Sequence, residues 1–300
     1  MSRPLADALS KLLATDSGLA SSQFTTAQRS ALDEFARKTQ AVCLTPQGRG
    51  AFYRLIHRGV AEAHLLKWRP ITQQDLPETL PLRAANVALY RNSKGTSASH
   101  AKQYLLFKSI TDGARWQNEL GQTMDLPALS HLYGAAALAV ETADGWHTDS
   151  PLWLVENQAL FDDLRWLPSD ASGTLCYYAG QISGGLLDWL SYRPRASRVI
   201  LFPDYDGIGL QNFARLRERL GDACEFWLIP GWAELLNRLG NREIWLNNLV
   251  NFQEAVTRLQ ALNMSPALVD LCRSLQTAGL ALEQESVFLT VDCRPKVSEE

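Results

Sequence analysis

The chain has 300 residues, of which 46% are hydrophobic and 20% are charged, and its formal net charge is −3. These values are typical of a soluble globular chain that is long enough for one large domain or two to three small ones. The longest weakly polar run, residues 133–140, is far too short to cross a bilayer, which excludes a membrane-spanning protein.

The charge is distributed unevenly along the chain. Residues 1–110 hold 15 of the 29 basic residues and only 7 of the 32 acidic ones. A basic first part joined to an acidic remainder supports one end that meets a polyanion and another that holds metal. Solubility alone also explains a charged surface, so the charge asymmetry is only supporting evidence for a polyanion-binding end and a metal-binding end.

Cysteine and histidine usage points to a reduced protein. The five cysteines are scattered without a Cys-x-x-Cys pair, and the five histidines show no pairing that suggests a zinc site or a nucleophile–base unit. Cys176 and Cys224 fall inside predicted strands, where we expect them in the core. The N-terminus leads into no stretch of signal-peptide type, and we expect a cytoplasmic protein.

The first third of the chain predicts a DNA-binding region. Residues 1–22 read as a short amphipathic helix and a Ser/Gly/Ala stretch, which we expect to form an N-terminal arm. Residues 23–110 are expected to be winged-helix-like, with a helix that starts at Thr25, a second helix that starts at Thr45 before Pro46, and a strand over 60–68.

Basic residues follow the second of these helices. Arg49, Arg54 and Arg58 can share much of one face, and in a winged helix this element would enter a DNA groove. After a Pro-rich linker, a strand from residue 86 is expected to run into a polar turn with Arg91 and Lys94. These cations either contact phosphate or decorate the surface, and the sequence leaves both readings open.

The rest of the chain alternates strands and helices. Residues 111–149 form a connecting segment with a helix over 126–132 and an Ala-rich strand over 135–140. In residues 150–235, four apolar strands are each followed by a helical pattern, which predicts a parallel, right-handed βαβ sheet. Residues 236–300 are expected to add a helical cap and a disordered tail.

Acidic residues follow two of these strands. Glu156 follows Leu-Trp-Leu-Val, and Asp204 and Asp206 follow Val-Ile-Leu-Phe-Pro. Ligands of an open α/β sheet bind outside the carboxyl ends of its strands, and the strand period of two sends both aspartates to the same face. Carboxylates held together repel one another unless a cation such as Mg²⁺ lies between them. The alternative to a metal site is a pair of solvated acids in a loop.

These strand endings carry a resemblance to a known family. A strand that ends in Glu156, a strand that ends in Gly180 and a strand that ends in Asp-x-Asp resemble the Toprim domain of topoisomerases, bacterial primases and nucleases. The stretch Asp204–Gly209 looks most like the Wadjet anti-plasmid nuclease subunit, which is related to the topoisomerase VI A subunit. The resemblance covers residues 150–290. Pro203 departs from it, because those relatives more often carry glycine there.

The resemblance implies a function. A Toprim nuclease of this type cleaves double-stranded DNA with Mg²⁺ or Mn²⁺ held by Glu and Asp-x-Asp, and the Wadjet subunit is expected to act as a homodimer beside a condensin-like SMC–kleisin complex. Gly180 and Gly207 would support the site. Glu283 and Glu285, in a Leu-Glu-Gln-Glu stretch similar to one in the same group, either add to the site or are solvated acids.

Three alternatives remain from the sequence. The first is strand cleavage through a covalent tyrosine, as in the topoisomerase VI A subunit, with Tyr53 as the candidate. The second is a haloacid-dehalogenase-type phosphatase with Asp204 as nucleophile, but that chemistry needs a downstream lysine and none lies between Lys108 and Lys296. The third is a non-catalytic DNA-binding assembly subunit.

Overall fold

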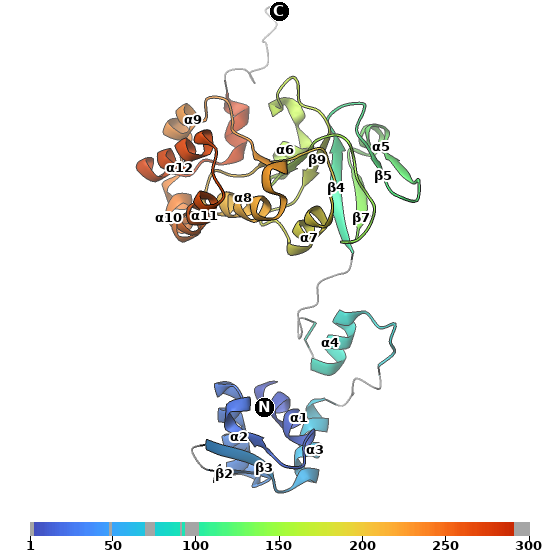
Figure 1. Ribbon diagram of the computed structural model, residues 1–300, viewed down its shortest axis with the longest axis vertical. Coiled ribbons are helices and arrows are strands. Elements are labelled where there is room, and N and C mark those ends of the chain that lie inside the picture. The colour runs from blue at the N-terminus through green and yellow to red at the C-terminus, as the bar shows by residue number, and fades with distance from the viewer. Residues whose placement is uncertain (1–2, 48–49, 70–75, 91, 94–101, 291–300) are drawn as a thin grey trace, which may run out of the picture. The chain divides into compact units, whose positions relative to one another are not determined.

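The computed structural model describes residues 3–47, 50–69, 76–90, 92–93 and 102–290. The chain divides into two compact units, residues 1–99 and 100–300 (Figure 1). Strand β4 (Gln103–Ser109), which the sequence boundaries placed with the N-terminal region, therefore belongs to the C-terminal unit. None of the helices in the described ranges is both long and apolar enough to cross a membrane.

The N-terminal unit packs helices against a small antiparallel sheet of strand order β1-β3-β2. Leu9, Leu32 and Tyr53 share one buried core, so the first helix is part of this fold rather than a separate arm. Thr25 caps the second helix in a capping box with Gln28, as its sequence predicts. The elements are α1 (Arg3–Leu13), β1 (Leu19–Ala20), η1 (Ser21–Gln23), α2 (Thr26–Thr39), β2 (Val42–Gln47), β3 (Gly50–Leu55), α3 (Arg58–Trp68) and α4 (Leu82–Tyr90).

Three sequence predictions in this unit are wrong. The expected helix from Thr45 is the β2–β3 hairpin, because its β-branched and aromatic residues pair across strands, as Thr45 does with Phe52. The expected strand over 60–68 is α3, whose Ala, Glu, Leu and Lys residues are strong helix formers. The expected strand from residue 86 is the alanine-rich helix α4.

The C-terminal unit is built on a six-stranded mixed sheet of order β11-β10-β8-β9-β4-β7. The predicted parallel βαβ arrangement is confirmed for four strands, to which β4 and β7 add an antiparallel pair. The parallel strands are β8 (Leu152–Val155), β9 (Thr174–Tyr177), β10 (Val199–Phe202) and β11 (Cys224–Phe226), and β7 spans Ala136–Val140. Cys176 and Cys224 are buried free thiols in this sheet.

Helices cover both faces of the sheet and its β11 side (Figure 1). The predicted helical cap is present, and its helix α11 packs against α8. The remaining elements are β5 (Arg115–Gln117), β6 (Thr123–Asp125), α5 (Leu126–Tyr133), α6 (Gln158–Asp162), η3 (Leu164–Trp166), α7 (Gly184–Tyr192), α8 (Gly207–Leu220), η4 (Gly221–Ala223), α9 (Trp232–Leu239), α10 (Arg242–Asn247), α11 (Leu249–Ala261), α12 (Pro266–Ala278) and η5 (Gln284–Leu289).

A buried arginine fastens the chain that leads into the sheet. The Arg195 side chain is fully buried, pairs with Asp144 at 2.9 Å and lies over the Trp189 ring at 4.6 Å. Its guanidinium also donates to the main-chain oxygens of Thr142 and Trp146. This network ties the segment before β8 to the end of α7 and so fixes where β8 begins.

Candidate functional site

The strand order defines a topological switch point at the centre of the parallel sheet. From β8 the chain goes to β9 on one side and then returns to β10 on the other, so the order reverses between β8 and β10. Ligands of open α/β sheets bind at such a switch point, outside the carboxyl ends of the strands. Val155 pairs with Phe202 in the β8–β10 ladder, so Glu156 and Asp204 emerge beside one another.

The structure brings together the three acids predicted from the sequence. The Glu156 carboxylate accepts a hydrogen bond from the Asp204 backbone N–H and another from the Tyr178 hydroxyl at 3.2 Å. Asp206 is only 6% exposed, and its Oδ1 accepts from the Gly209 N–H at 2.8 Å, which caps helix α8. Capping alone would account for Asp206, but it accounts for neither Glu156 nor Asp204.

Two further residues hold the aspartates, and sequence reasoning missed both. The Asn248 side chain donates to Asp206 Oδ2 at 2.8 Å, and the Gln284 backbone N–H donates to Asp204 Oδ1 at 2.8 Å. Asn248 lies between α10 and α11, which approach α8 so closely that a Cβ at Gly207 would clash with the Asn248 carbonyl oxygen. Gly207 therefore supports the site by permitting this contact.

The segment before η5 crosses the ends of β8 and β10. Tyr205 and Leu282 form an antiparallel bridge with backbone hydrogen bonds of 2.8 and 3.1 Å. The buried Gln284 side chain accepts from the Asn157 N–H at 3.2 Å and donates to the Phe202 oxygen at 3.4 Å. These bonds fix the segment across the ends of the two strands.

This crossing decides between the two glutamates that the sequence left open. The Glu285 charge acts on both Glu156 and Asp204, and its Oε2 is buried without a hydrogen-bond partner among the described residues. Glu283, two residues earlier, is exposed. Glu285 therefore belongs to the acidic site and Glu283 to the surface.

The loop after β9 supports Glu156 from the other side. Ala179 and Gly180 both have positive φ angles, 54° and 75°, which glycine adopts readily and alanine does not. Fully buried Asn212 on α8 donates to the Gly180 oxygen at 3.3 Å and accepts from the Ile182 N–H at 3.1 Å. These contacts hold the loop, and with it Tyr178, against Glu156.

Burial and mutual repulsion shift the pKa values of the acids. Burial, followed by the charges of Glu156, Asp206 and Glu285, raises the pKa of Asp204 to about 8, although the Gln284 hydrogen bond opposes this shift. Burial and then the Asp206 charge raise the pKa of Glu156 to about 7. Burial also raises the pKa of Asp206, against its three hydrogen bonds.

These acids lack a compensating side-chain cation in the described part of the chain, where none of the four forms an ion pair with Lys or Arg. Buried carboxylates without a counter-charge are stabilised by protons or by a cation. Their oxygens suit Mg²⁺ or Mn²⁺, and the partnerless oxygen of Glu285 fits a cation. No three His, Cys, Asp or Glu side chains within the described ranges are close enough to hold one metal ion in common, so a cation would have to draw the carboxylates together.

The residues predicted to bind DNA do not form a common helical face. Arg54 is exposed on β3, whereas Arg58 begins α3 and pairs with Asp16 at 3.2 Å and Glu62 at 2.9 Å. Arg49, Arg91 and Lys94 lie outside the described residues. The expected single basic face is therefore wrong, because Arg54 lies on a strand and Arg58 on a helix.

Tyr53 is poorly placed for covalent chemistry. It is 1% exposed, and its hydroxyl donates to Asp33 Oδ1 at 2.7 Å. Burial and this hydrogen bond raise its pKa to about 12. A phosphodiester would reach this hydroxyl only after local opening of the N-terminal core.

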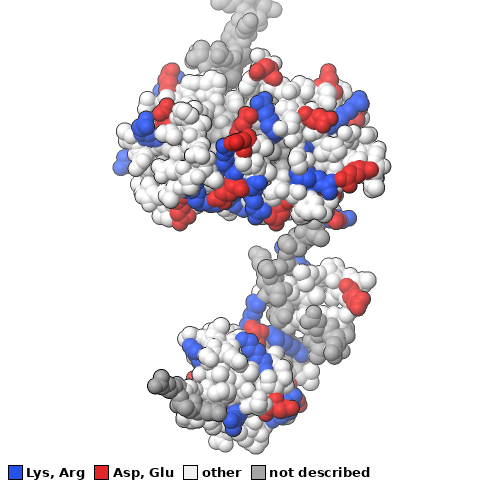
Figure 2. Space-filling view, in the orientation of Figure 1, with Lys and Arg blue, Asp and Glu red and all other residues white. Residues whose placement is uncertain are grey.

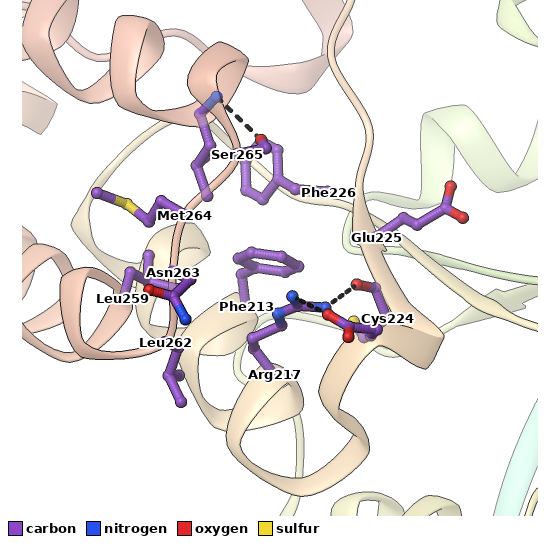
Figure 3. A pocket seen from close by; sticks show the side chains of 12 residues that line it. Phe213, Arg217, Cys224, Glu225, Phe226, Leu259, Leu262, Asn263, Met264 and Ser265 are labelled. Carbon is purple, nitrogen blue, oxygen red and sulfur yellow. Dashed lines mark hydrogen bonds and ion pairs between the residues drawn. The ribbon is translucent and has the colours of Figure 1, made fainter.

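A separate hollow of about 290 Å³ lies between α8, β11 and the α11–α12 connection (Figure 3). Phe213 and Phe226 line it, and Arg217 points toward the Cys224 carbonyl oxygen, to which it donates at 3.4 Å, and also pairs with Asp222. Cys224 is the first residue of β11, so this hollow opens toward the amino edge of the sheet. The acids stand at the carboxyl edge, and the hollow takes no part in their site.

The surface charge gives little further evidence about where the functional site lies. On the face in view, Lys and Arg are interspersed with Asp and Glu over the C-terminal unit (Figure 2). The acidic excess of residues 111–300 is therefore not gathered into one patch on that face. The informative charges are the buried ones at the carboxyl ends of β8 and β10.

Fold and site together define an α/β protein with a buried acidic cluster at the switch point of its parallel strands. Residues 119–291 match the family described as "Domain of unknown function (DUF7281)", and the chain belongs to that family. The matched segment contains Glu156, Asp204, Asp206 and Glu285 together with Asn248. No curated protein matches the sequence.

Proposed function

We propose that the chain is a divalent-metal-dependent DNA endonuclease of Toprim type. The observation that supports it most is the convergence of Glu156, Asp204, Asp206 and Glu285, from three separate segments, at the carboxyl ends of β8 and β10. The sequence pattern that resembles Toprim domains supplies three of these acids at the ends of two neighbouring parallel strands. Such a cluster of charged carboxylates destabilises a fold unless protons or a cation neutralise it, so its presence favours a functional role over a structural one.

The chemistry follows from charge. A phosphodiester is anionic and resists hydroxide; a bound Mg²⁺ or Mn²⁺ supplies charge neutralisation, activation of water and stabilisation of the leaving oxygen. The protein's part is to present carboxylate oxygens in fixed directions. Tyr178 orients Glu156, Gln284 orients Asp204 and Asn248 orients Asp206, each by a direct hydrogen bond.

The N-terminal unit is proposed to bind the DNA. Its order of helix, strand, helix and hairpin, with a sheet of order β1-β3-β2, supports a winged-helix-like assignment. In that arrangement α2, which exposes Arg37 and Lys38, takes the place of the groove-binding helix. This replaces the sequence-based proposal that residues 45–58 fill that role.

The resemblance to the Wadjet nuclease subunit extends the proposal to biology. A homodimer would cut both strands of plasmid DNA beside a condensin-like SMC–kleisin complex. This partnership rests on the resemblance alone. Co-purification of the chain with the products of neighbouring genes is its direct test.

A plasmid assay tests the chemistry. Supercoiled plasmid is incubated with the full chain and Mg²⁺ or Mn²⁺, with EDTA as the metal-free control. We expect nicked or linear DNA, lost in the Asp204→Ala, Asp206→Ala protein and retained in Glu283→Gln, which removes an exposed acid from the same region. Full cleavage by the double variant would refute the site. DNA binding without cleavage by the native chain would favour the non-catalytic alternative, and a covalent adduct lost in Tyr53→Phe the topoisomerase-like one.

A further inference from the structure

Strand β7 forms one edge of the six-stranded sheet, beside β4 and at the opposite end from β11 (Figure 1). Its five residues, Ala-Ala-Leu-Ala-Val, pair with β4 in an unbroken antiparallel register. Among the residues that the structure describes, none forms a backbone hydrogen bond to the outer side of β7. An unpaired edge of this kind is a template for a further strand.

The hydrogen bonds of β4 show which residues of β7 face outward. The Ile110 N–H, at the end of β4, donates to the Gly173 oxygen on the β9 side. The N–H groups of a strand alternate between its two neighbours, so even-numbered residues of β4 bond to β9 and odd-numbered residues bond to β7. Leu138 pairs with an odd-numbered residue of β4 and is bonded to it. The N–H and C=O groups of Ala137 and Ala139 therefore point away from the sheet.

These outward groups are complementary to a second copy of themselves. When another β7 runs antiparallel to the first, with Leu138 on a twofold axis, Ala137 of each copy lies opposite Ala139 of the other. Residues that face one another in this way exchange both of their N–H···O bonds. A contact that uses the same surface on both copies closes after two of them, so it gives a dimer and not a fibre.

The surroundings of the β7 edge favour a neutral partner. Residues 132–140 contain no charged side chain, and they expose Leu132 and Tyr133. A charged partner would find no counter-charge along this strand, whereas a second copy brings an equally neutral edge. The opposite edge strand, β11, has only three residues and carries Glu225, which pairs with Arg198 at 3.3 Å. Short length and charge are the usual protection of an edge strand, and β7 lacks the charge.

Exposed apolar side chains extend the contact beyond the backbone. Tyr104 pairs with Ala139 and Leu106 pairs with Ala137, so these side chains share one face of the sheet. Tyr104 is 74% exposed and Leu106 is 37% exposed. Because the alanines are small, the Tyr104 ring can lie over them toward Leu106 of the second copy. Burial of one such ring adds roughly 150 Å² toward the about 800 Å² per partner of a standard interface.

We infer that β7 pairs antiparallel with β7 of a second copy, about an axis at Leu138, so that the two copies share one continuous sheet. The inference gives the homodimer of the proposed function its surface and is independent of DNA cleavage. Strands β9 and β4 stand between β8 and the join, so the acids of each copy remain clear of it.

A charge swap on β7 tests both the pairing and its register. Ala137 and Ala139 are exposed, so charged side chains at these positions leave the core intact. Ala137→Lys with Ala139→Lys sets like charges opposite one another across the join, and Ala137→Lys with Ala139→Glu sets opposite charges there. Sedimentation equilibrium of the full chain, in EDTA and without DNA, measures the dimer Kd. We expect a dimer for the native chain and the opposite-charge variant, and a monomer for the like-charge variant.

A proline on the same edge tests the backbone bonds alone. Ala137→Pro removes an outward N–H of each copy and none that bonds to β4, and proline is tolerated at such an edge position. The loss of these bonds should weaken the dimer roughly 5- to 150-fold. Ala233→Lys, which adds a charge at an exposed position of α9, is the matched control and should dimerise as the native chain does. Tryptophan fluorescence verifies that each variant is folded.

Each outcome decides the inference. A native dimer that the like-charge variant dissociates and the opposite-charge variant retains supports it, whether or not the chain cuts plasmid. A monomeric native chain overturns it. A like-charge variant with native dimer affinity also overturns it, and so does an opposite-charge variant that dimerises as poorly as the like-charge one. Metal-dependent plasmid cleavage by a monomeric native chain would retain the proposed chemistry and remove only the dimer.

Discussion

Replacing Asp204 with Asn should stabilise the metal-free protein near neutral pH and remove its response to Mn²⁺. Asp204 Oδ1 accepts the Gln284 N–H at 2.8 Å, and an asparagine retains an oxygen acceptor at this position. The substitution removes the negative charge of Asp204 and with it the repulsion between Asp204 and the charges of Glu156, Asp206 and Glu285. A residue that we propose to hold the metal is thus expected to weaken the metal-free fold.

The pKa shift gives the size and the sign of the effect. The pKa of Asp204 is about 8 in the folded chain, and about 4 is usual for an unfolded one. The folded state therefore holds a proton that the unfolded state releases, so this stability is complete below about pH 4 and is lost as pH rises to about 8. One pH unit corresponds to about 1.4 kcal/mol for one such group. Between pH 5.5 and 7.5 the native chain should lose on the order of 3 kcal/mol relative to Asp204→Asn.

Urea unfolding followed by tryptophan fluorescence measures this difference, since eight of the nine tryptophans lie in residues 100–300. Both proteins are unfolded in EDTA at pH 5.5 and 7.5 and again with Mn²⁺. At 100 times its Kd, Mn²⁺ should add about 2.7 kcal/mol to the native chain and nothing to the variant. Glu283→Gln should behave as the native chain. The electrostatic reasoning would be refuted if the free energies of unfolding of Asp204→Asn and the native chain differed equally at both pH values. It would also be refuted if the variant were less stable than the native chain at pH 7.5.

Three further substitutions test the surroundings of the site. Tyr178→Phe keeps the ring but removes the 3.2 Å hydrogen bond to Glu156, so calorimetry should show Mn²⁺ binding weakened several-fold with unfolding little changed. Gly207→Ala should destabilise the fold by about 1–3 kcal/mol in thermal unfolding, because its Cβ meets the Asn248 carbonyl oxygen. Arg195→Met should cost about 3 kcal/mol or more in urea unfolding, because Asp144 loses its partner.

Each of these has a contrary result. Native Mn²⁺ affinity in Tyr178→Phe would show that Glu156 needs no orienting partner. A Gly207→Ala protein as stable as the native chain would mean that α11 moves freely against α8. Arg195→Met without destabilisation would show that the segment before β8 is held by packing alone.

The parallel sheet was predictable because its strands are continuous apolar runs. Val199–Phe202 is buried along its whole length, and such a run followed by glycines and a helical pattern has few other structural solutions. Strand β4 was not predicted as part of the sheet. Its alternating exposure, with Leu105 and Phe107 buried and Tyr104 exposed, is a weaker signal, and only its pairing with β9 gives it a place.

The N-terminal errors have a common physical origin. A Thr before a Pro suits both the start of a helix and a strand at the edge of a small sheet, so Thr45-Pro46 does not discriminate between them. The contact of the Tyr53 ring with Phe24, in a core that leaves the tyrosine 1% exposed, favours the hairpin. That contact joins residues that are distant in sequence, so it cannot be predicted from a short stretch of neighbouring residues.

Part of the candidate site could likewise be predicted from the local sequence, and part only from contacts between residues distant in sequence. Glu156, Asp204 and Asp206 were predictable because each follows a strand, and the carboxyl edge of a parallel sheet collects whatever follows its strands. Glu285 was distinguishable from Glu283 only by structure. The bridge of Tyr205 with Leu282 sets the register of the crossing segment, so that Glu283 is exposed, Gln284 is buried and Glu285 comes close to the other acids in the first turn of η5. A shift of one residue in that bridge would exchange the buried amide for an acid, which is why the fourth carboxylate depends on a contact some 80 residues away in sequence.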